Sequence, residues 1–389
     1  IQWGYAGLFN IGVAGFMAVG VYSMAFLSAS PSGSPAGLGL PLWIGVGGGM
    51  LAASLVGFVA ALPALRLRSD YLAITTVAIS EIIRLTYNSP AFASVTVGGT
   101  TLGTGGASGF GNLPTNPVRA LYFAEPGNPA SDPSGLGAAV FGFASSVGVT
   151  RSAVVVDVTY ALFLAALVIA VYLLLARVGD SPFGRVLKAI REDELVARSL
   201  GKDTRVFKIK TFMLGCALMG LVGIVWQGAL NAVYPQSFRP ELTFYIFIAL
   251  IIGGAGSNTG SVLGGALFSS LLFLGPQYVP DLVNTYAHIT TRPGTFVAAI
   301  SAVAGGHPGA FAGYVVGNIF ALRFVFVGVL LVYMMQRRPE GLLGHRKEEA
   351  ASVDLSVRPD AGATGGDGRE TGRPTESREA DVAREVSDE

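Results

Sequence analysis

The chain has 389 residues and a formal net charge of +1; 51% of its residues are hydrophobic and only 13% are charged. A soluble domain carries about 25% charged residues, and an ionised group at the centre of a bilayer costs several kcal/mol. This composition excludes an ordinary water-soluble domain and predicts an all-α membrane protein. The 53 glycines fit, because Gly lets membrane helices approach closely.

Eight stretches approach the roughly 20 mainly apolar residues that a spanning helix needs. They are residues 5–29, 41–65, 71–87, 157–176, 211–233, 241–256, 262–280 and 317–336. The first, sixth and seventh are rich in Gly, which leaves a broken or re-entrant path open for them. We therefore expect a polytopic helical bundle of about eight transmembrane helices. Because the sequence begins inside an apolar stretch, we also expect a further segment upstream.

Other regions are predicted not to span. Residues 88–156 and 281–316 are expected to be outer loops, with 295–313 at the interface, whereas the charged, helix-prone residues 177–210 are expected inside. Residues 1–347 then form one transmembrane domain. The remainder, 348–389, holds 12 acidic and 5 basic residues and almost no large apolar groups, so we expect a disordered acidic tail.

Lys and Arg are unevenly distributed between the two sides. If Arg66 and Arg68 face the cytoplasm, eight alternating spans put 177–210 and the end of the last span on that side as well. That side then holds fifteen Lys and Arg and the other side five, leaving out Arg84 and the tail. The positive-inside rule therefore predicts a cytoplasmic C-terminus.

Small residues recur every four positions in two regions. They are Gly45, Gly49, Ala53 and Gly57, and then Gly256, Gly260 and Gly264. This spacing lines one helix face with minimal side chains, so that a second helix can pack closely. Packing within one bundle is the plainer interpretation, and a lining for a substrate path or a dimer is the alternative.

The stretch 181–201 predicts an amphipathic helix. Ser181 suits the N-cap, Pro182 the first turn and Gly201 a left-handed stop. Its apolar face is Phe183, Leu187 and Ile190, with Arg185, Lys188 and Arg191 beside it. The helix either lies plainly on the membrane surface or docks a cytoplasmic partner.

Four polar residues within the spans are candidates for a transport path. Glu81 and Arg84 share a helix face and can pair; ionisable groups in a span are functional candidates, and a structural ion pair near the outer end is the alternative. Gln227 and Asn231 share a face near the outer end of 211–233. Packing hydrogen bonds explain these two as well as substrate contact does.

The motifs of most enzymes are missing from the sequence. A single cysteine, Cys216, permits neither an internal disulfide nor a thiolate metal cluster, and the three histidines form no HExxH pair. There is no GxxxxGK[ST] phosphate loop, no GxGxxG in a strand–helix setting and no legible Ser/His/Asp or Cys/His set. We expect no catalytic residue, no bound metal and no bound cofactor.

Several motifs together are more specific. They are Gly4-Tyr-Ala-Gly-Leu-Phe-Asn-Ile-Gly12 with Ala14 and Phe16, Leu67-Arg-Ser-Asp-Tyr-Leu-Ala-Ile-Thr75 with Glu81-Ile-Ile-Arg-Leu85, Gly184-Arg-Val-Leu-Lys-Ala-Ile-Arg-Glu-Asp-Glu194 with Leu200-Gly201, Gly253-Gly-Ala-Gly-Ser257, and Arg338-Pro-Glu-Gly-Leu-Leu-Gly344. Over residues 3–110, 157–280 and 317–345 the chain resembles the permease subunits of ABC importers for branched-chain amino acids, of the LivM type.

The resemblance implies a prokaryotic cell-membrane complex with a homologous permease subunit, two ATPase subunits and an extracytoplasmic solute-binding protein. ATP and Mg would bind the ATPase subunits, and no nucleic-acid partner is expected. The stretch 181–201 would be the coupling helix that docks on an ATPase subunit. Its docking residues would be Phe183, Gly184, Arg185, Leu187, Ile190, Arg191, Glu194, Ala197 and Gly201. Permeases carry Glu-Ala-Ala at the equivalent of Leu195-Val196-Ala197, so the docking residues are not fixed by this motif.

The substrate and the transport class keep alternatives. Related permeases carry urea or short amides, and apolar spans do not discriminate between these cargoes. A stand-alone channel or secondary transporter would need ion-coupling groups in the membrane and an internal repeat. The spans offer only Glu81 and Arg84, and no convincing repeat is visible.

Overall fold

The structure is a computed structural model of the whole chain. It describes residues 1–65, 67, 69–97, 100–111, 113, 117–124, 131–228, 230, 232–287, 293–338 and 340–343. The chain divides into two compact units, Ile1–Arg346 and Lys347–Glu389. The predicted acidic tail, 348–389, and the cationic residues Arg66 and Arg68 lie outside the described residues.

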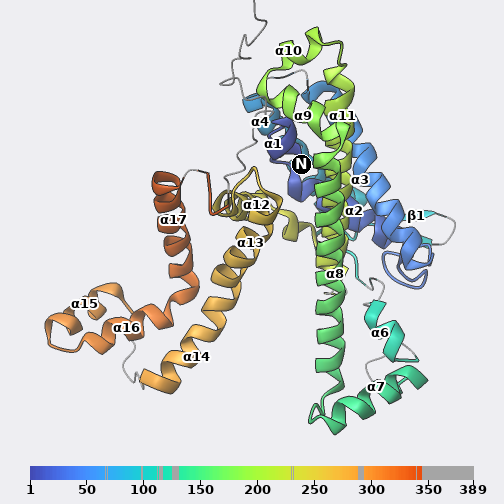
Figure 1. Cartoon of the computed structure of the whole chain (residues 1–389). Coiled ribbons are helices and arrows are strands. Elements are labelled where there is room, and N and C mark those ends of the chain that lie inside the picture. The colour runs from blue at the N-terminus through green and yellow to red at the C-terminus, as the bar shows by residue number, and fades with distance from the viewer. Residues whose placement is uncertain are drawn as a thin grey trace, which may run out of the picture. The chain divides into compact units, whose positions relative to one another are not determined.

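Long helices account for most of the described chain (Figure 1). Five are long and apolar enough to cross a membrane: Leu42–Ala64, Ser152–Asp180, Thr204–Gln227, Asn258–Val283 and Ile319–Arg337. They correspond to α3 (Leu42–Ala64), α8 (Ser152–Asp180), α11 (Thr204–Gly228), the run of α13 (Asn258–Ser269), η3 (Ser270–Leu274) and α14 (Gly275–Ala287), and α17 (Ile319–Arg337). The chain is an all-helical, multi-pass membrane protein.

Four shorter or more polar helices occupy the other three predicted spans. The first span is broken into α1 (Gln2–Ala6) and α2 (Val13–Ser28), where Gly7 takes a φ of 66° and ends α1. The third predicted span is α4 (Ser69–Asn88), which carries Glu81 and Arg84. The sixth is α12 (Pro240–Gly253), which is only 14 residues long. The glycines of the first stretch therefore mark a break within it, whereas those of the sixth lie at the end of α12 and in the turn before α13.

Helix α2 forms the centre of the main bundle. Apolar residues surround it on all sides, as expected for a buried helix, and it packs against α3, α4 and α11. Close approach depends on small residues: a Cβ at Gly20 would lie 2.3 Å from the Cα of Gly220. Phe16 packs edge-on against Phe212, which joins α2 to the N-terminal half of α11.

A second cluster joins α12, α13, η3 and α17 through Ile252, Phe268, Leu272 and Val327. The chain beyond α17 returns to the end of α12, where the amide nitrogens of Leu342 and Leu343 donate to the carbonyls of Ile252 and Gly253. The element η3 is a π-helical turn. The carbonyl of Leu272 within it accepts a hydrogen bond from Arg323 Nη1 at 2.9 Å.

The segments expected as outer loops contain regular structure. Within 88–156 the chain forms α5 (Pro90–Ala93), β1 (Val95–Val97), β2 (Thr100–Leu102), η1 (Gly106–Ser108), α6 (Pro117–Tyr122) and α7 (Gly135–Ser146). The two strands pair antiparallel with Val95 opposite Leu102. Within 281–316 lie α15 (Phe296–Ala304) and α16 (Pro308–Gly317), so 295–313 is a helical hairpin and not the predicted loop. Thr295 caps α15, and Pro308 opens α16.

The stretch 181–201 starts and ends as predicted, but it is two helices. Ser181 accepts from the amide of Gly184 at the start of α9 (Pro182–Glu192), and Gly201 has a φ of 75°. The helix breaks at Asp193, whose carboxylate caps α10 (Glu194–Ser199) by accepting from Leu195 and Val196. A short 3-10 turn, η2 (Pro235–Phe238), precedes α12.

Candidate functional site

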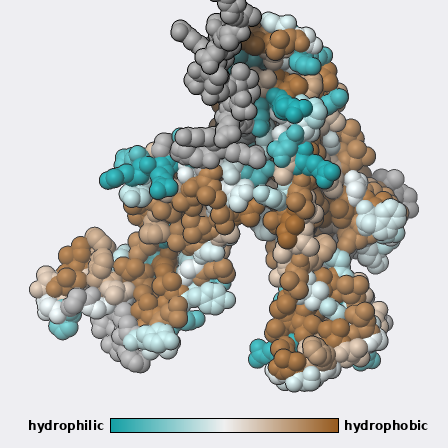
Figure 2. Space-filling view, in the orientation of Figure 1, coloured by the Kyte–Doolittle hydropathy of each residue, from teal (hydrophilic) through white to brown (hydrophobic). Residues whose placement is uncertain are grey.

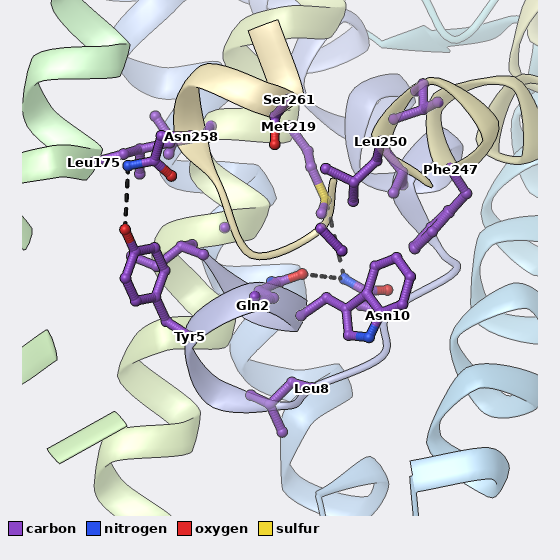
Figure 3. Close-up of a pocket in the computed structure, with 18 of the residues that line it drawn as sticks. Gln2, Tyr5, Leu8, Asn10, Leu175, Met219, Phe247, Leu250, Asn258 and Ser261 are labelled. Atoms are coloured by element: carbon purple, nitrogen blue, oxygen red, sulfur yellow. Dashed lines mark hydrogen bonds between the residues drawn. The ribbon is translucent and has the colours of Figure 1, made fainter. Parts of the chain in front are cut away.

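A cavity of about 370 Å³ lies beside two turns of the chain (Figure 3). One turn is 7–12, between α1 and α2, and the other is 254–257, between α12 and α13. The volume is within the range of about 300–1,000 Å³ that is typical of small-ligand sites. A cavity of this size, bordered by irregular backbone, is the leading candidate for a solute site.

The walls of the cavity are mainly apolar. They include Leu8, Leu175 of α8, Met219 of α11, and Phe247 and Leu250 of α12. Polar groups reach the cavity from Gln2, Tyr5, Asn10, Asn258 and Ser261. An apolar lining with a few placed polar groups is the usual composition of a site for a small, partly apolar ligand.

Hydrogen bonds fix these polar groups. The Nε2 of Gln2 donates to the carbonyl of Phe212 at 3.0 Å, and its Oε1 accepts from Asn10 Nδ2 at 3.1 Å. On the other side, Asn258 Nδ2 donates to the hydroxyl of Tyr5 at 3.2 Å (Figure 3). Gln2 and Asn10 are almost fully buried, so their amides are held in place before any solute arrives.

Side-chain oxygens accept hydrogen bonds from backbone N–H groups at the start of α2 and of α13. At α2, the amide of Gly12 donates to Asn10 Oδ1 at 2.9 Å, and that of Ala14 donates to Thr243 Oγ1 at 3.1 Å. At α13, Ser257 Oγ accepts from the amide of Gly260 at 3.0 Å. The first N–H groups of a helix have no partner within the helix, and these contacts stabilise both breaks.

The polar residues of the cavity were not identified from the sequence. A signal for them exists, because Gly-x-Ala-Gly followed by Asn-x-Gly occurs at 4–12 and again at 253–260, with one residue fewer before the second Asn. Both copies line the same cavity, through Gly4 and Asn10 and through Gly256 and Asn258. Comparing the two motifs with each other would have paired them.

Glu81 and Arg84 form an ion pair on α4 away from this cavity. Arg84 Nε donates to Glu81 Oε2 at 2.9 Å, and the Nη1 of Arg84 donates to Gln236 at 3.3 Å. The pair therefore joins α4 to η2, and neither residue lines the cavity.

Gln227 is fully buried at the end of α11. Neither of its amide atoms has a hydrogen-bond partner within the part of the chain that the structure describes. Gln227 does not line the cavity either, and Asn231, predicted to share its helix face, lies outside the described residues.

The predicted small-residue faces lie in helix interfaces, with one exception. Gly45, Gly49, Ala53 and Gly57 are buried on α3, and a Cβ at Gly57 would lie 2.7 Å from Cys216 on α11. Gly260 and Gly264 pack against the backbone of α12. Gly256 instead lines the cavity.

The apolar face of α9 is turned into the protein. Gly184, Leu187 and Ile190 are buried, and the ring of Phe183 stacks on Phe207 of α11 at 5.2 Å. These side chains anchor α9 to the bundle. Arg185 is exposed, and Arg191 reaches back to α1.

Helix α10 presents the opposite pattern. Ala197 is buried, but Leu195, Val196 and Leu200 are 72%, 55% and 72% exposed. These three residues, which we name the α10 apolar face, lie at the end of the bundle where hydrophilic residues gather around α9 and α10 (Figure 2). Exposed apolar groups among charged ones are typical of a protein contact.

An ion-pair cluster holds α10 onto α11. Glu194 contacts Lys208 at 2.6 Å and Arg198 at 2.8 Å, and it accepts from Thr204 at 2.9 Å. Burial acts to raise the pKa of the Glu194 carboxyl, but the hydrogen bonds from Lys208 and Thr204 and the charge of Lys208 outweigh it, so the pKa lies below its ordinary value.

Comparison with known proteins identifies the family of this chain. Residues 1–291 match the family model of the permease component of branched-chain amino acid transport systems. The chain belongs to this family. The match includes every residue of the cavity, α9 and α10, and it ends before α15.

The chain is also similar in sequence to individual members of this permease family. The chain is 30% identical over 266 residues to the high-affinity branched-chain amino acid transport system permease protein LivM of Escherichia coli K12, and 29% identical to that of Salmonella typhimurium. Each match covers 68% of this chain and 56% of the relative. A probable LivM of Methanocaldococcus jannaschii is 29% identical, over 55% of this chain and 52% of the relative. The chain thus spans about half the length of these relatives. No solved structure matches it.

Proposed function

We propose that this chain is the permease subunit of an ATP-driven importer. With a second, homologous permease subunit it forms the path by which branched-chain amino acids cross a prokaryotic cell membrane. The observation that carries the proposal is the cavity beside the turns 7–12 and 254–257, inside the region that matches the family. Its apolar wall suits a branched aliphatic side chain, and its amide and hydroxyl groups suit the ammonium and carboxylate of an amino acid.

The motor would be a pair of separate ATPase subunits, which bind ATP and Mg. We place their contact at the α10 apolar face, on the cytoplasmic side, because Leu195 and Leu200 are exposed there beside the charged helix α9. A solute-binding protein would deliver the amino acid on the opposite side of the membrane.

The test is uptake of labelled leucine by cells that express the chain with the proposed second permease subunit, ATPase subunits and solute-binding protein. Uptake should require this chain and stop when the ATPase subunits are left out. Urea and acetamide as competitors separate the alternative cargo: neither should reduce leucine uptake. Leucine uptake that persists without any ATPase subunit would mean a channel or secondary transporter.

A further inference from the structure

Helix α1 is a small element with contacts on several sides. Gln2 binds the carbonyl of Phe212 on α11 and the side chain of Asn10, which precedes α2. Gly4 and Tyr5 make further contacts, which connect α1 to α9 and to the turn between α12 and α13.

The first of these elements is α9, which packs on the surface of the bundle. Arg191 Nη1 donates a hydrogen bond to the carbonyl of Gly4. The ammonium of Lys188 lies 5.8 Å from the centre of the Tyr5 ring, within the range of a cation–π interaction. A Cβ at Gly7 would lie 3.2 Å from Cγ of Arg191. One face of α1 is therefore packed directly against α9.

The second is the turn between α12 and α13, on the cavity side. Tyr5 accepts a hydrogen bond from Asn258, the first residue of α13, across the cavity wall (Figure 3). Gly4 packs so closely on this turn that a Cβ would lie 2.4 Å from the carbonyl oxygen of Ala255. A displacement of α1 must therefore move or release the turn, because packed backbone has no slack.

We propose that α1 transmits movement of α9 to the cavity, and that the hydrogen bond between Tyr5 and Asn258 is the link that couples them. Tyr5 is a positioning residue: its ring is held by α9, and its hydroxyl holds the start of α13 at the cavity. This inference rests on the proposed function, since it assigns the internal route by which a motor docked on α9 and α10 changes the solute site.

The test compares variants in the complete transporter, reconstituted in proteoliposomes with leucine. Tyr5→Phe removes only the hydroxyl. The loss of one such hydrogen bond corresponds to about a fivefold change, so we expect about fivefold less leucine transported per ATP hydrolysed. Asn258→Ala removes the donor of the same hydrogen bond. It serves as the test variant if Tyr5→Phe does not fold. The double variant should lose no more than the larger single loss, because both changes remove one interaction.

Tyr172→Phe is the matched control. The hydroxyl of Tyr172 hydrogen-bonds to Thr259, the neighbour of Asn258, at 3.0 Å, but it comes from α8 and not from α1. Its ratio of leucine to ATP should equal that of the unchanged chain. The proposal is overturned if Tyr5→Phe keeps the normal ratio, if the two single losses add, or if Tyr172→Phe loses as much. An unchanged transporter that takes up no leucine would instead overturn the proposed function.

Discussion

Two glutamines in the bundle differ in how their amides are satisfied. Gln2 donates and accepts hydrogen bonds, whereas neither amide atom of Gln227 has a partner among the described residues, although both side chains are buried. An unsatisfied buried polar group costs about 1–3 kcal/mol. We therefore expect Gln227→Leu to raise the midpoint of thermal unfolding and the matched change Gln2→Leu to lower it.

Both midpoints can be measured on purified protein in one detergent, with and without leucine. A lower midpoint for Gln227→Leu would mean that its amide has a partner in the membrane. If the loss appeared only with leucine present, that partner would be the solute, and Gln227 would belong to the transport path.

Glu194 should make stability depend on pH. Its pKa in the folded chain lies below the value of about 4.3 for unfolded peptides. A carboxylate with a lowered pKa stabilises the fold fully above the unfolded pKa, and this contribution is lost as the pH falls through the folded pKa. Glu194→Gln should thus lower the unfolding midpoint at neutral pH, and its difference from the unchanged chain should shrink below about pH 4.

The control for this pH dependence is Glu192→Gln. Glu192 pairs with Arg191, but its side chain is 71% exposed, and such surface pairs contribute little. Its midpoint should follow that of the unchanged chain at every pH. A Glu194→Gln variant whose deficit stayed constant down to pH 3 would show that the carboxylate's charge does not matter.

At the scale of the element, α3 offers a direct test of close helix packing. A Cβ at Gly49 would lie 2.4 Å from the carbonyl oxygen of Gly20 on α2, whereas one at Gly47 would meet nothing within 4 Å. Overpacking costs about 1–3 kcal/mol, but Ala is favoured over Gly in an open helical position by up to about 1 kcal/mol. Gly49→Ala should therefore lower the unfolding midpoint, and Gly47→Ala should leave it equal or higher. Equal midpoints for the two variants would mean that α2 and α3 separate easily.

Elements set by local chemistry could be predicted from the sequence. The ends of the 181–201 segment follow from Ser181, Pro182 and Gly201, each of which acts on its own backbone. The break at Asp193 could not be predicted, because an Asp is compatible with a helix interior and with a cap, and the choice depends on how Glu194 is held by α11. Periodicity likewise located the spans but not the interior of the outer segments.

The candidate site lay beyond local reasoning. Tyr5 and Asn258 are 253 residues apart, and the motif around each gains meaning only when the two copies are compared with each other. Glu81 and Arg84 attracted interest because charge is rare in a span, yet they satisfy each other on α4. The neutral polar residues Asn10 and Asn258 line the cavity beside glycine-containing turns.

At the scale of the whole molecule, two exposed apolar surfaces differ in their surroundings: that of the span α8 and that of α10 at the charged end of the bundle. None of the most apolar window of α8 is buried within the chain, and at about 1.5 Å per residue its 29 residues are long enough to cross a hydrocarbon core of about 30 Å. Lipid or another apolar subunit must therefore cover α8 (Figure 2). The α10 apolar face differs, because it lies among charged side chains, where we propose a protein partner.

The last prediction concerns that partner. Leu195 and Leu200 make up most of the α10 apolar face, and changing both to Ser should leave the fold intact because both are 72% exposed. Burying one Leu at a contact contributes about 1.5–3 kcal/mol, and 1.4 kcal/mol is a factor of ten in affinity. The double variant should therefore hold the ATPase subunits at least tenfold more weakly in co-purification and lose ATP-dependent uptake, while its level in the membrane is unchanged. Leu136→Ser on α7, where the side chain is 56% exposed, is the control and should retain the ATPase subunits. If the double variant retained them equally well, the motor would dock elsewhere, and α9 would be an internal brace.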